Sequence, residues 1–226
     1  MVELSMKNFW KNKKVFITGH TGFKGSWLSL WLYHLGSNIM GYSLPISNNE
    51  FLFKKLNIKN KIKNVSGDIN DFKKLNRNLI KFNPDIIFHL AAQPLVLDSY
   101  LNPRETFNTN IMGTINLLNS SRDLKKLQSV IIVTSDKCYE NNEKQYNFKE
   151  NDKLGGDDPY SASKAAAEIV TSSYYKSYFK KIGVATVRSG NVIGGGDNSK
   201  NRIVPDIIRS VNNNNDLVLR NPNSTR

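Results

Sequence analysis

Tyr160 and Lys164 are the residues whose types and spacing suggest chemistry most directly. They stand four positions apart in the segment DPYSASK, at the start of a stretch that we expect to be helical, so their side chains share one face. An ammonium beneath a phenol favours the phenolate and lowers the pKa of the tyrosine from about 10 toward neutrality. Tyr160 could then take a proton from a substrate hydroxyl while hydride leaves the same carbon. The alternative is two exposed residues on an amphipathic helix.

Asp136 and Lys137 form a second pair, which follows the apolar run SVIIV and the residues Thr134 and Ser135. Because side chains alternate between the faces of a strand, both can reach one cleft only if the backbone turns directly after Ser135. A neighbouring ammonium lowers the pKa of a carboxyl group, so we interpret the two as a coupled pair sharing one proton in a site dried by its substrate. The alternative is a surface ion pair.

The segment TGHTGFKG places Gly19, Gly22 and Gly25 between an expected strand and an expected helix. Glycines allow a tight turn and a close backbone approach to a pyrophosphate, which binds at a helix N-terminus. The spacing differs from the usual G-x-G-x-x-G, and a simple strand-to-helix turn is the alternative.

The second expected strand ends at Tyr42 and Ser43, with no acid for a ribose 2′-hydroxyl and no arginine for a 2′-phosphate, so charge does not decide between NAD and NADP.

Two further residues have competing interpretations. Asp68, beside Ile69, is expected to follow a strand that lies between 43 and 68 and whose bounds the sequence does not mark. It is well placed to accept a hydrogen bond from an adenine amino group. It could equally cap the helix that starts near Phe72. Cys138 is interpreted as a packed small hydrophobic residue rather than a nucleophile, because no histidine or helix N-terminus near it in sequence would activate its thiol.

Short β-branched runs alternate with amphipathic stretches along the chain, which predicts a doubly wound parallel sheet of the Rossmann type with helices on both faces. The expected strands are 14–18, 38–43, 85–92, 129–135 and 183–189, and the expected helices are 23–36, 71–82, 106–122 and 159–179. After Ser189 only a short helix near 202–212 and a strand at 217–220 are expected. We therefore expect a dinucleotide-binding domain over 1–188 and the start of a small, incomplete substrate-binding domain over 189–226.

Composition restricts the class of protein. The 226 residues carry a net charge of +13, but the lysines are scattered among asparagines and isoleucines, which argues against a nucleic-acid partner. No apolar run reaches the roughly 20 residues that cross a bilayer, and no signal peptide is evident, so we expect no membrane partner. The single cysteine favours a reducing, cytoplasmic location. The three histidines have no spacing typical of a metal site, and no metal is expected.

Several blocks together resemble a known superfamily. TGHTGFKG, HLAAQ, YSASK and RSGNVIG, in this order, are similar to the extended short-chain dehydrogenases/reductases. Within them, GHTGFKGSWL, AAQPLV, TSDKCYEN, DPYSASK, GNVIGGGD and RIVPD resemble the CDP-glucose 4,6-dehydratase family over nearly the whole chain. The resemblance implies a tightly held NAD cofactor and the conversion of CDP-glucose to CDP-4-keto-6-deoxyglucose and water.

The resemblance also implies roles for the two pairs. Tyr160 takes the proton of the C4 hydroxyl while hydride passes from C4 to NAD. Lys137 then takes the C5 proton, and Asp136 protonates the departing C6 hydroxyl. Hydride finally returns to C6, and C5 regains a proton. Ser135, or else Thr134, hydrogen-bonds near the C4 oxygen. Related nucleotide-sugar dehydratases carry glutamate at the position of Lys137, so lysine there marks the CDP-sugar branch.

A wider set of contacts follows from the same resemblance. The residues expected to bind the cofactor are Gly19, Thr21, Gly22, Phe23, Lys24, Gly25, Tyr42, Ser43, Asp68, Ile69, Leu90, Ala91, Ala92, Gln93, Thr134, Tyr160 and Lys164. Asn191 is expected to contact the nucleotide sugar, and Arg202 and Arg220 its diphosphate, although each arginine could instead be a solvated surface charge. Asn110 either organises backbone or water near the nicotinamide or serves as a cap or core hydrogen-bonding residue.

Other functions on the same scaffold stay open. They are a 4,6-dehydratase for another nucleotide sugar, a sugar-nucleotide epimerase, and a non-catalytic NAD-binding protein. An epimerase would not need the acid/base pair Asp136–Lys137. A homodimer that pairs through the helices 106–122 and 159–179 is also expected from the resemblance.

Overall fold

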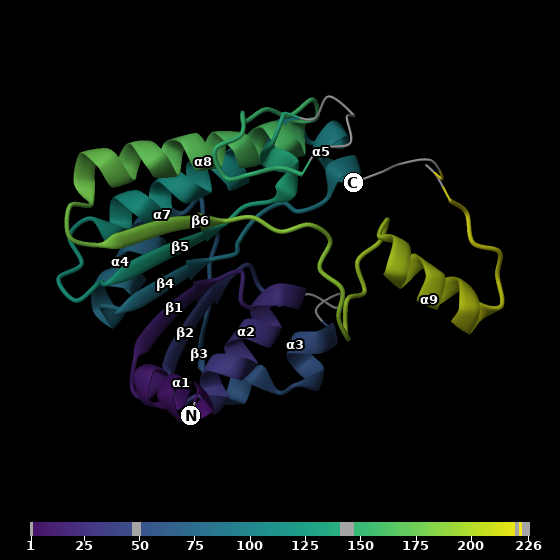
Figure 1. The fold of residues 1–226 in the computed structure, drawn as a ribbon. Coiled ribbons are helices and arrows are strands. Elements are labelled where there is room, and N and C mark those ends of the chain that lie inside the picture. Colours follow the sequence, from purple (N-terminus) through teal and green to yellow (C-terminus); the bar gives the residue numbers. More distant parts are fainter. Residues whose placement is uncertain (1, 47–50, 141–146, 220–221, 223–226) are drawn as a thin grey trace.

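A six-stranded parallel sheet forms the centre of the computed structural model, which describes residues 2–46, 51–140, 147–219 and 222 (Figure 1). The strands are β1 (Lys14–Thr18), β2 (Asn38–Ser43), β3 (Lys63–Ser66), β4 (Ile86–His89), β5 (Ser129–Val133) and β6 (Gly183–Val187), in the order β3-β2-β1-β4-β5-β6. All neighbouring pairs are parallel. The order reverses between β1 and β4, the place where ligands bind in such sheets. The expected fold class is confirmed.

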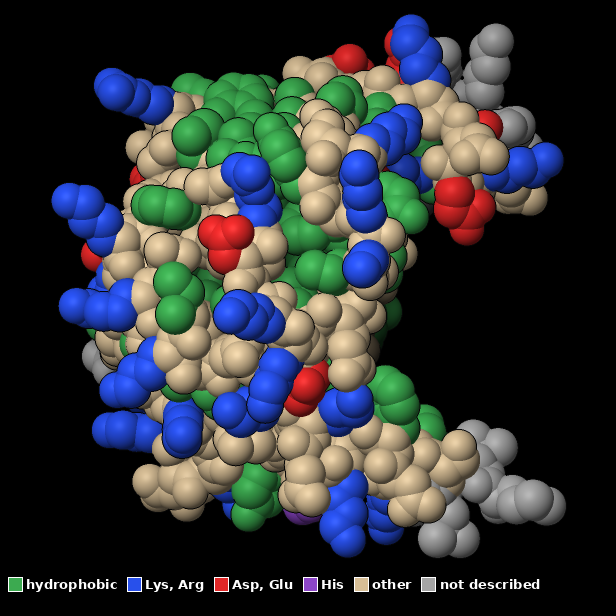
Figure 2. Space-filling view, turned by 90° about the vertical axis from the view of Figure 1, so that its left-hand side faces the viewer, with side chains coloured by type: hydrophobic (Ala, Val, Ile, Leu, Met, Phe, Trp, Pro, Cys, Tyr) green, Lys and Arg blue, Asp and Glu red, His purple; other side chains and the backbone are tan. Residues whose placement is uncertain are grey.

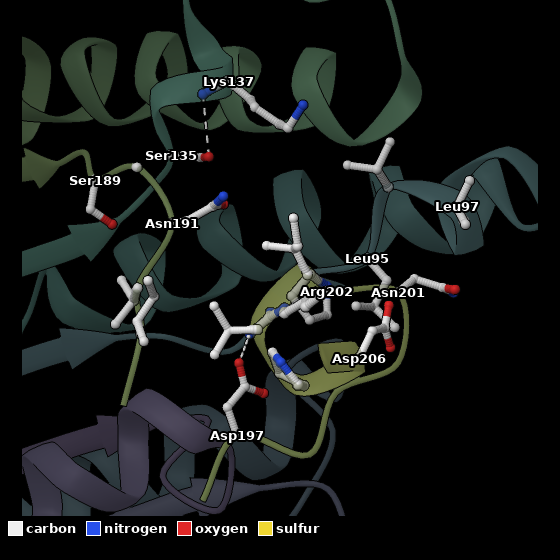
Figure 3. Close-up of a pocket in the computed structure, with 18 of the residues that line it drawn as sticks. Leu95, Leu97, Ser135, Lys137, Ser189, Asn191, Asp197, Asn201, Arg202 and Asp206 are labelled. Carbon is white, nitrogen blue, oxygen red and sulfur yellow. Dashed lines mark hydrogen bonds and ion pairs between the residues drawn. The ribbon is translucent and has the colours of Figure 1, made fainter. Parts of the chain in front are cut away.

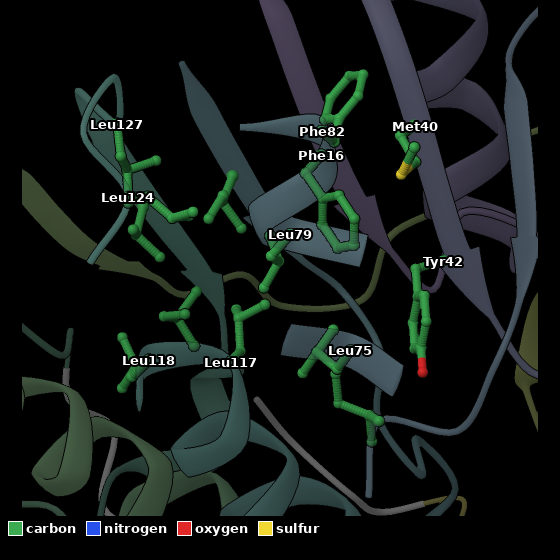
Figure 4. Close-up of a cluster of buried hydrophobic side chains, with 14 of the residues drawn as sticks. Phe16, Met40, Tyr42, Leu75, Leu79, Phe82, Leu117, Leu118, Leu124 and Leu127 are labelled. Atoms are coloured by element: carbon green, nitrogen blue, oxygen red, sulfur yellow. The ribbon is translucent and has the colours of Figure 1, made fainter. Parts of the chain in front are cut away.

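Both faces of the sheet are buried, which explains why the central strands read as continuous apolar runs rather than alternating ones. In β1, Val15 and Ile17 point to one face and pack with Leu32 and Ile39. Phe16 points to the other face and joins the larger cluster of buried side chains shown in Figure 4. The side-chain alternation of one strand therefore supplies two separate cores.

Helices cover each face in a separate layer (Figure 1). One layer holds α1 (Val2–Trp10), α2 (Phe23–His34) and α3 (Phe51–Lys55), and the other holds α4 (Phe72–Phe82), α7 (Gly113–Ser121) and α8 (Pro159–Tyr178). Smaller elements are η1 (Ile58–Asn60), α5 (Val96–Leu101), α6 (Pro103–Phe107), η2 (Asn108–Met112) and η3 (Asp136–Cys138). The helix expected over 106–122 is thus divided, because η2 is a π-helical turn between α6 and α7.

The chain beyond β6 leaves the sheet and crosses to α9 (Ile203–Asn213), which lies apart from the two helical layers (Figure 1). The strand expected at 217–220 is wrong for the part described, because 217–219 have no regular structure. A strand needs a hydrogen-bonding neighbour, and no strand of the described sheet pairs with this run. Arg220 lies outside the described residues.

Positive charge is spread over the surface. Figure 2 shows Lys and Arg side chains distributed across one face, while apolar side chains gather at its top, at the level of α8 in Figure 1. Within the described ranges, no helix is both long enough and apolar enough to span a membrane. The same ranges contain no group of three or more His, Cys, Asp or Glu side chains that could hold a metal ion.

Candidate active site

A cavity of about 450 Å³ opens beyond the carboxyl ends of β5 and β6, and Figure 3 shows many of its lining residues. Its walls come from the end of β5, the first turn of α8, the segment after β4, the first turn of α2 and the chain after β6. The predicted site residues among the lining are Lys24, Thr134, Ser135, Asp136, Lys137, Tyr160, Asn191 and Arg202. Segments far apart in sequence thus converge on one volume.

The backbone turns directly after Ser135, which is the condition for Asp136 and Lys137 to reach one cleft. Ser135 is extended and caps the short helix η3 by accepting a hydrogen bond from the backbone N–H of Lys137 at 3.3 Å. Its hydroxyl donates to Oδ1 of Asp136 at 3.1 Å. Because of this turn, Asp136 and Lys137 line the same cavity. Among the ion pairs between described residues, none joins these two side chains. The shared proton stays a prediction.

Tyr160 and Lys164 are fixed by the start of α8. Asp158 is the N-cap, with Oδ1 accepting from the N–H of Ser161 at 2.9 Å, and Pro159 occupies the first turn. Tyr160 and Lys164 are both buried on one face of this helix. They are therefore not two exposed residues of an amphipathic surface.

The ammonium of Lys164 reaches the end of β5, where Nζ donates to the carbonyl oxygen of Val133 at 3.1 Å. Burial and, to a smaller extent, the nearby positive charge of Lys24 lower the pKa of Lys164 to about 8, although Glu168 opposes the shift. A lysine whose pKa lies near neutrality can gain or lose its charge within the pH range in which most enzymes work.

The expected lowering of the tyrosine pKa by Lys164 is wrong for this structure. Burial raises the pKa of Tyr160, and this effect exceeds the lowering by a hydrogen bond with Ser135. The negative charge of Asp136 raises it further. The physical reason is that Lys164 directs its ammonium to Val133, so desolvation of the phenol is not offset.

The glycine loop has one packed side and one open side. Gly19 has φ +69°, and a Cβ there would lie 2.7 Å from the backbone nitrogen of Ala91, so only glycine fits. A Cβ on Gly25 would lie 2.1 Å from the carbonyl oxygen of Gly19. A Cβ on Gly22, the N-cap of α2, would meet only the Gly19 oxygen at 3.5 Å. The open side lies at a helix N-terminus, which suits a pyrophosphate.

The exit of β4 is held beside this loop. The hydroxyl of Thr18 accepts hydrogen bonds from the N–H groups of Leu90 at 3.2 Å and Ala91 at 3.1 Å. Leu90, Ala91 and Ala92 are all partly exposed.

Asn110 is buried and hydrogen-bonded on both sides of its amide, partly to the backbone of Gln93, so the bonds fit both a core role and the ordering of backbone near the cofactor. Its Oδ1 accepts from the N–H of Gln93 at 2.9 Å, and its Nδ2 donates to Oγ of Ser163 at 2.8 Å. The hydroxyl of Ser163 in turn donates to the carbonyl oxygen of Tyr160 at 2.7 Å. Asn110 lies within the π-helical turn η2, and through these bonds it joins the β4 exit to the first turn of α8.

Tyr42 and Ile69 lie deeper than expected. Tyr42 is 1% exposed, belongs to the larger hydrophobic core and donates its hydroxyl to the carbonyl oxygen of Asp68 at 3.0 Å. Burial raises the pKa of Tyr42 to about 12. Ile69 is buried in the same core. The side chain of Asp68 is exposed, and Asp71 rather than Asp68 caps α4, so the capping alternative for Asp68 is wrong.

The rest of the cofactor set surrounds the start of α2. The hydroxyl of Thr21 donates to Ser43 at 3.1 Å, which joins the glycine loop to the end of β2. Lys24 lines the cavity, and burial followed by the charge of Arg202 lowers its pKa. Phe23 lies next to Gly194 in the chain after β6.

The segment after β6 is attached to α2. Trp27 donates its indole N–H to the carbonyl oxygen of Gly195 at 2.9 Å. Arg202 lines the cavity, and its guanidinium forms an ion pair with Asp197 at 2.9 Å. The sequence did not indicate this partner. Leu95 and Leu97 also line the cavity; their only signal in the sequence was their place after the AAQ segment.

Two side chains near the catalytic turn interact with the protein interior. Thr134 donates its hydroxyl to the carboxylate of Glu168 at 2.5 Å, so this hydroxyl is not directed at the predicted cofactor. Cys138 is fully buried, and burial raises the pKa of its thiol to about 11. This agrees with a packed residue rather than a nucleophile.

Comparisons with known proteins agree with this geometry. The family described as GDP-mannose 4,6 dehydratase matches residues 16–226. The chain is 48% identical to a CDP-glucose 4,6-dehydratase of Salmonella typhimurium, over 97% of the chain and 63% of that protein. It is 33% identical to a dTDP-D-glucose 4,6-dehydratase of Dictyostelium discoideum, over 89% of the chain and 49% of that protein. The chain thus spans less than two thirds of the length of these curated relatives.

Solved structures of similar proteins share the fold. A UDP-N-acetylglucosamine 4-epimerase from Methanobrevibacter ruminantium has 25% identity and a TM-score of 0.79, over 91% of this chain and 64% of that one. A dTDP-glucose 4,6-dehydratase from Bacillus anthracis in complex with NAD has 21% identity and a TM-score of 0.76, over 91% of this chain and 63% of that one. At these identities the second likeness concerns the fold alone.

Proposed function

The chain belongs to the GDP-mannose 4,6-dehydratase family, and on this premise we propose that it catalyses the NAD-dependent 4,6-dehydration of a nucleotide sugar, CDP-glucose. The observation that carries the proposal is the convergence of Asp136, Lys137 and Tyr160 on one cavity. An oxidation at C4 needs only the tyrosine and its lysine. Loss of water between C5 and C6 also needs a base and an acid, and the pair after β5 supplies both.

Each residue has a task that its position supports. Tyr160, hydrogen-bonded with Ser135, takes the proton of the C4 hydroxyl. The ketone formed at C4 acidifies the C5 proton, which Lys137 removes, while Asp136 protonates the departing C6 hydroxyl. NAD held at the glycine loop would supply a reversible hydride acceptor for C4 and donor for C6. C5 regains a proton at the end, so the net reaction is a dehydration. Lys164, on the same helix face as Tyr160, supplies positive charge next to this chemistry.

The glycine loop supports NAD as the cofactor. Gly22 is the N-cap of α2, where backbone N–H groups favour an anion, and Gly19 and Gly25 close the loop behind it through tight backbone contacts. The exposed Asp68 stays available to accept from an adenine amino group. The Bacillus anthracis dehydratase of the same fold is described in complex with NAD, which also supports this choice.

CDP-glucose is proposed as the substrate because the 48% identical relative is a CDP-glucose 4,6-dehydratase. Lys137 stands where other dehydratases of the superfamily are expected to carry glutamate. Lys24 and Arg202 line the cavity and bring positive charge for a diphosphate, and Asn191 contributes an amide. Arg220 stays a prediction.

The test is incubation with NAD and, separately, CDP-glucose, dTDP-glucose, UDP-glucose and GDP-mannose, followed by mass spectrometry of the products. We expect loss of one water from CDP-glucose. Asp136→Asn should slow this loss by about a hundredfold or more, since it removes the acid, while the exposed-acid control Asp157→Asn should not. Loss of water from another sugar alone would contradict the base assignment.

A product of unchanged mass would instead indicate an epimerase. The specific observation in favour of this second candidate is the similarity to the UDP-N-acetylglucosamine 4-epimerase structure. Retained NAD binding with no turnover of any sugar would favour the non-catalytic alternative.

A homodimer in the cytoplasm completes the proposal. Large apolar side chains on the elements expected to pair are exposed, among them Phe107, Met112 and Ile169. Such a set is typical of a surface covered by another protein. The buried state of the single thiol, Cys138, is compatible with a reducing compartment.

A further inference from the structure

Glu168 is a buried carboxylate that the proposed reaction leaves without a task. It is 5% exposed, its Oε1 lies 4.0 Å from the thiol of Cys138, and it accepts four hydrogen bonds from hydroxyl and guanidinium groups. These come from Thr134 Oγ1 at 2.5 Å, Thr186 Oγ1 at 2.6 Å, and Arg188 Nε and Nη2 at 2.9 Å each. A buried charge with four donors is a costly arrangement to assemble, since each donor must be held in place.

The position of Glu168 relates it to the site. Tyr160, Lys164 and Glu168 are spaced by four residues each, so they follow one another along one face of α8. The carboxylate therefore lies behind the catalytic lysine and not at a distant part of the helix.

The donors of Glu168 connect it to the catalytic turn. Thr134 directly precedes Ser135 and Asp136, and Thr186 and Arg188 belong to the end of β6 and the residue after it. The same two chain ends are joined by backbone bonds from Thr134 N to Val187 O at 2.9 Å and from Asp136 N to Ser189 O at 3.1 Å. One carboxylate thus joins α8 to both chain segments that carry Asp136 and Asn191.

We propose that Glu168 is a positioning residue of this site, which holds Thr134 and Arg188, and through them the turn from Ser135 to Lys137, against α8. The inference rests on the proposed function for its effect on turnover. An ordinary buried ion pair would add stability only, and replacing it would change the site no more than a comparable change elsewhere in α8.

The single cysteine of the chain reports on this turn without any turnover. Cys138 is the last residue of η3 and is 0% exposed, so a thiol reagent reaches it only when the turn opens. Its rate of labelling by iodoacetamide in the folded protein, followed by intact mass, measures how often this happens. Thr134→Val removes the hydrogen bond to Glu168 while it keeps the carboxylate charge.

The matched control is the same substitution at Thr171. Thr171 is also buried on α8, and its hydroxyl donates to the carbonyl oxygen of Ala167 at 2.7 Å, away from the turn. We expect Thr134→Val to speed labelling of Cys138 about tenfold to a hundredfold, the range for losing one hydrogen bond to a charged group. Thr171→Val and the conservative Thr134→Ser should stay within about threefold of the wild type.

Glu168→Gln tests the carboxylate itself. It should also speed labelling, and measuring the rate at several pH values separates opening of the turn from a change in thiol ionisation, because Glu168 raises the pKa of Cys138. With saturating NAD, Thr134→Val and Glu168→Gln should lower kcat for CDP-glucose about tenfold or more, with KM changed less than about threefold.

The outcomes separate the two proposals. Labelling of Thr134→Val no faster than that of Thr171→Val would overturn the positioning role, and so would faster labelling with an unchanged kcat. A wild type that turns over no nucleotide sugar would count against the proposed function. The labelling rates would then still decide whether Glu168 holds the turn.

Discussion

Gly19 and Gly22 lie three residues apart in one loop, yet their surroundings give them different tasks. Gly19 combines a positive φ with backbone contact to Ala91, so its lack of a side chain is needed to form the fold. Gly22 has an ordinary φ, and a Cβ there would make only an ordinary contact with the Gly19 oxygen at 3.5 Å, so the fold itself does not require glycine at this position.

The first prediction compares alanine at these two positions. Gly19→Ala should lower the free energy of unfolding by about 1–3 kcal/mol or more, because of the left-handed backbone and the contact with Ala91. Gly22→Ala should change it by less than about 0.5 kcal/mol but weaken NAD binding, measured by calorimetry, by about tenfold. Full NAD affinity in Gly22→Ala would contradict the cofactor site.

The second prediction concerns Lys164 and pH. Burial lowers its pKa from the usual 10.5 to about 8 in the folded protein, so folding below pH 8 buries a charge. Between pH 8 and 10.5 the unfolded chain binds more protons at this group, and stability rises with pH through this range. Relative to Lys164→Met, the wild type should therefore gain stability from pH 7 to 9.5, measured by urea unfolding. The exposed Lys176→Met is the control. A difference independent of pH would refute the shift.

Residue types and spacing were enough to find the site but not to orient each side chain. Tyr160, Asp136 and Lys137 meet as expected because a turn capped by Ser135 follows β5. Asp71 rather than Asp68 caps α4. The sequence could not distinguish them, because either aspartate, three residues apart, could cap a helix that starts near Phe72. Tyr42 turned into the core, which a strand pattern alone does not exclude.

At the scale of elements, α8 begins where its sequence predicts. Asp158 accepts hydrogen bonds from both the N–H of Ser161, at 2.9 Å, and its hydroxyl, at 2.6 Å, and Pro159 follows the cap. The first turn of this helix carries Tyr160, so the cap also fixes the position of a proposed catalytic residue.

The third prediction is that Asp158→Ala lowers the free energy of unfolding by about 1 kcal/mol, because two donors lose their acceptor at the start of α8. Thermal and urea unfolding provide the measurement. Asp157→Ala, an exposed neighbour, should have little effect. Equal losses in both variants would mean that charge near the helix N-terminus, and not the cap, is responsible.

The π-helical turn η2 and the strand β3 show where element prediction reaches its limit. Periodicity indicated one helix over 106–122, and nothing in NTNIM marks the extra residue that brings Asn110 to Gln93 and Ser163. Strand β3, KNVS, lies at the sheet edge and is only partly buried, so it lacks the apolar run that reveals the central strands.

At the scale of the whole molecule, the strand order follows from the alternation of strands and helices, because right-handed crossovers leave few topologies. The chain after β6 could not be predicted in the same way. Its apolar residues, such as Ile208 and Val218, find few partners among the described residues, so local pattern and final structure are only loosely linked there.

The fourth prediction tests the proposed dimer. Light scattering should give about twice the chain mass of 25.7 kDa. Ile169→Glu, on α8, should shift the protein toward the monomer, because a charge would be buried in the interface. Ile80→Glu, on α4, is the control, since the two isoleucines are 60% and 57% exposed. A monomeric wild type would refute the dimer, and dissociation of both variants would move the interface to α4.

The hydrogen bond between Trp27 and Gly195 has a practical consequence for the molecule as a whole. The indole of Trp27 lies two residues after the glycine loop and is also hydrogen-bonded to the chain that follows β6. Its intrinsic fluorescence should therefore respond when either wall shifts. Ligand binding in the cavity could therefore be followed by tryptophan fluorescence, without a dye and without turnover.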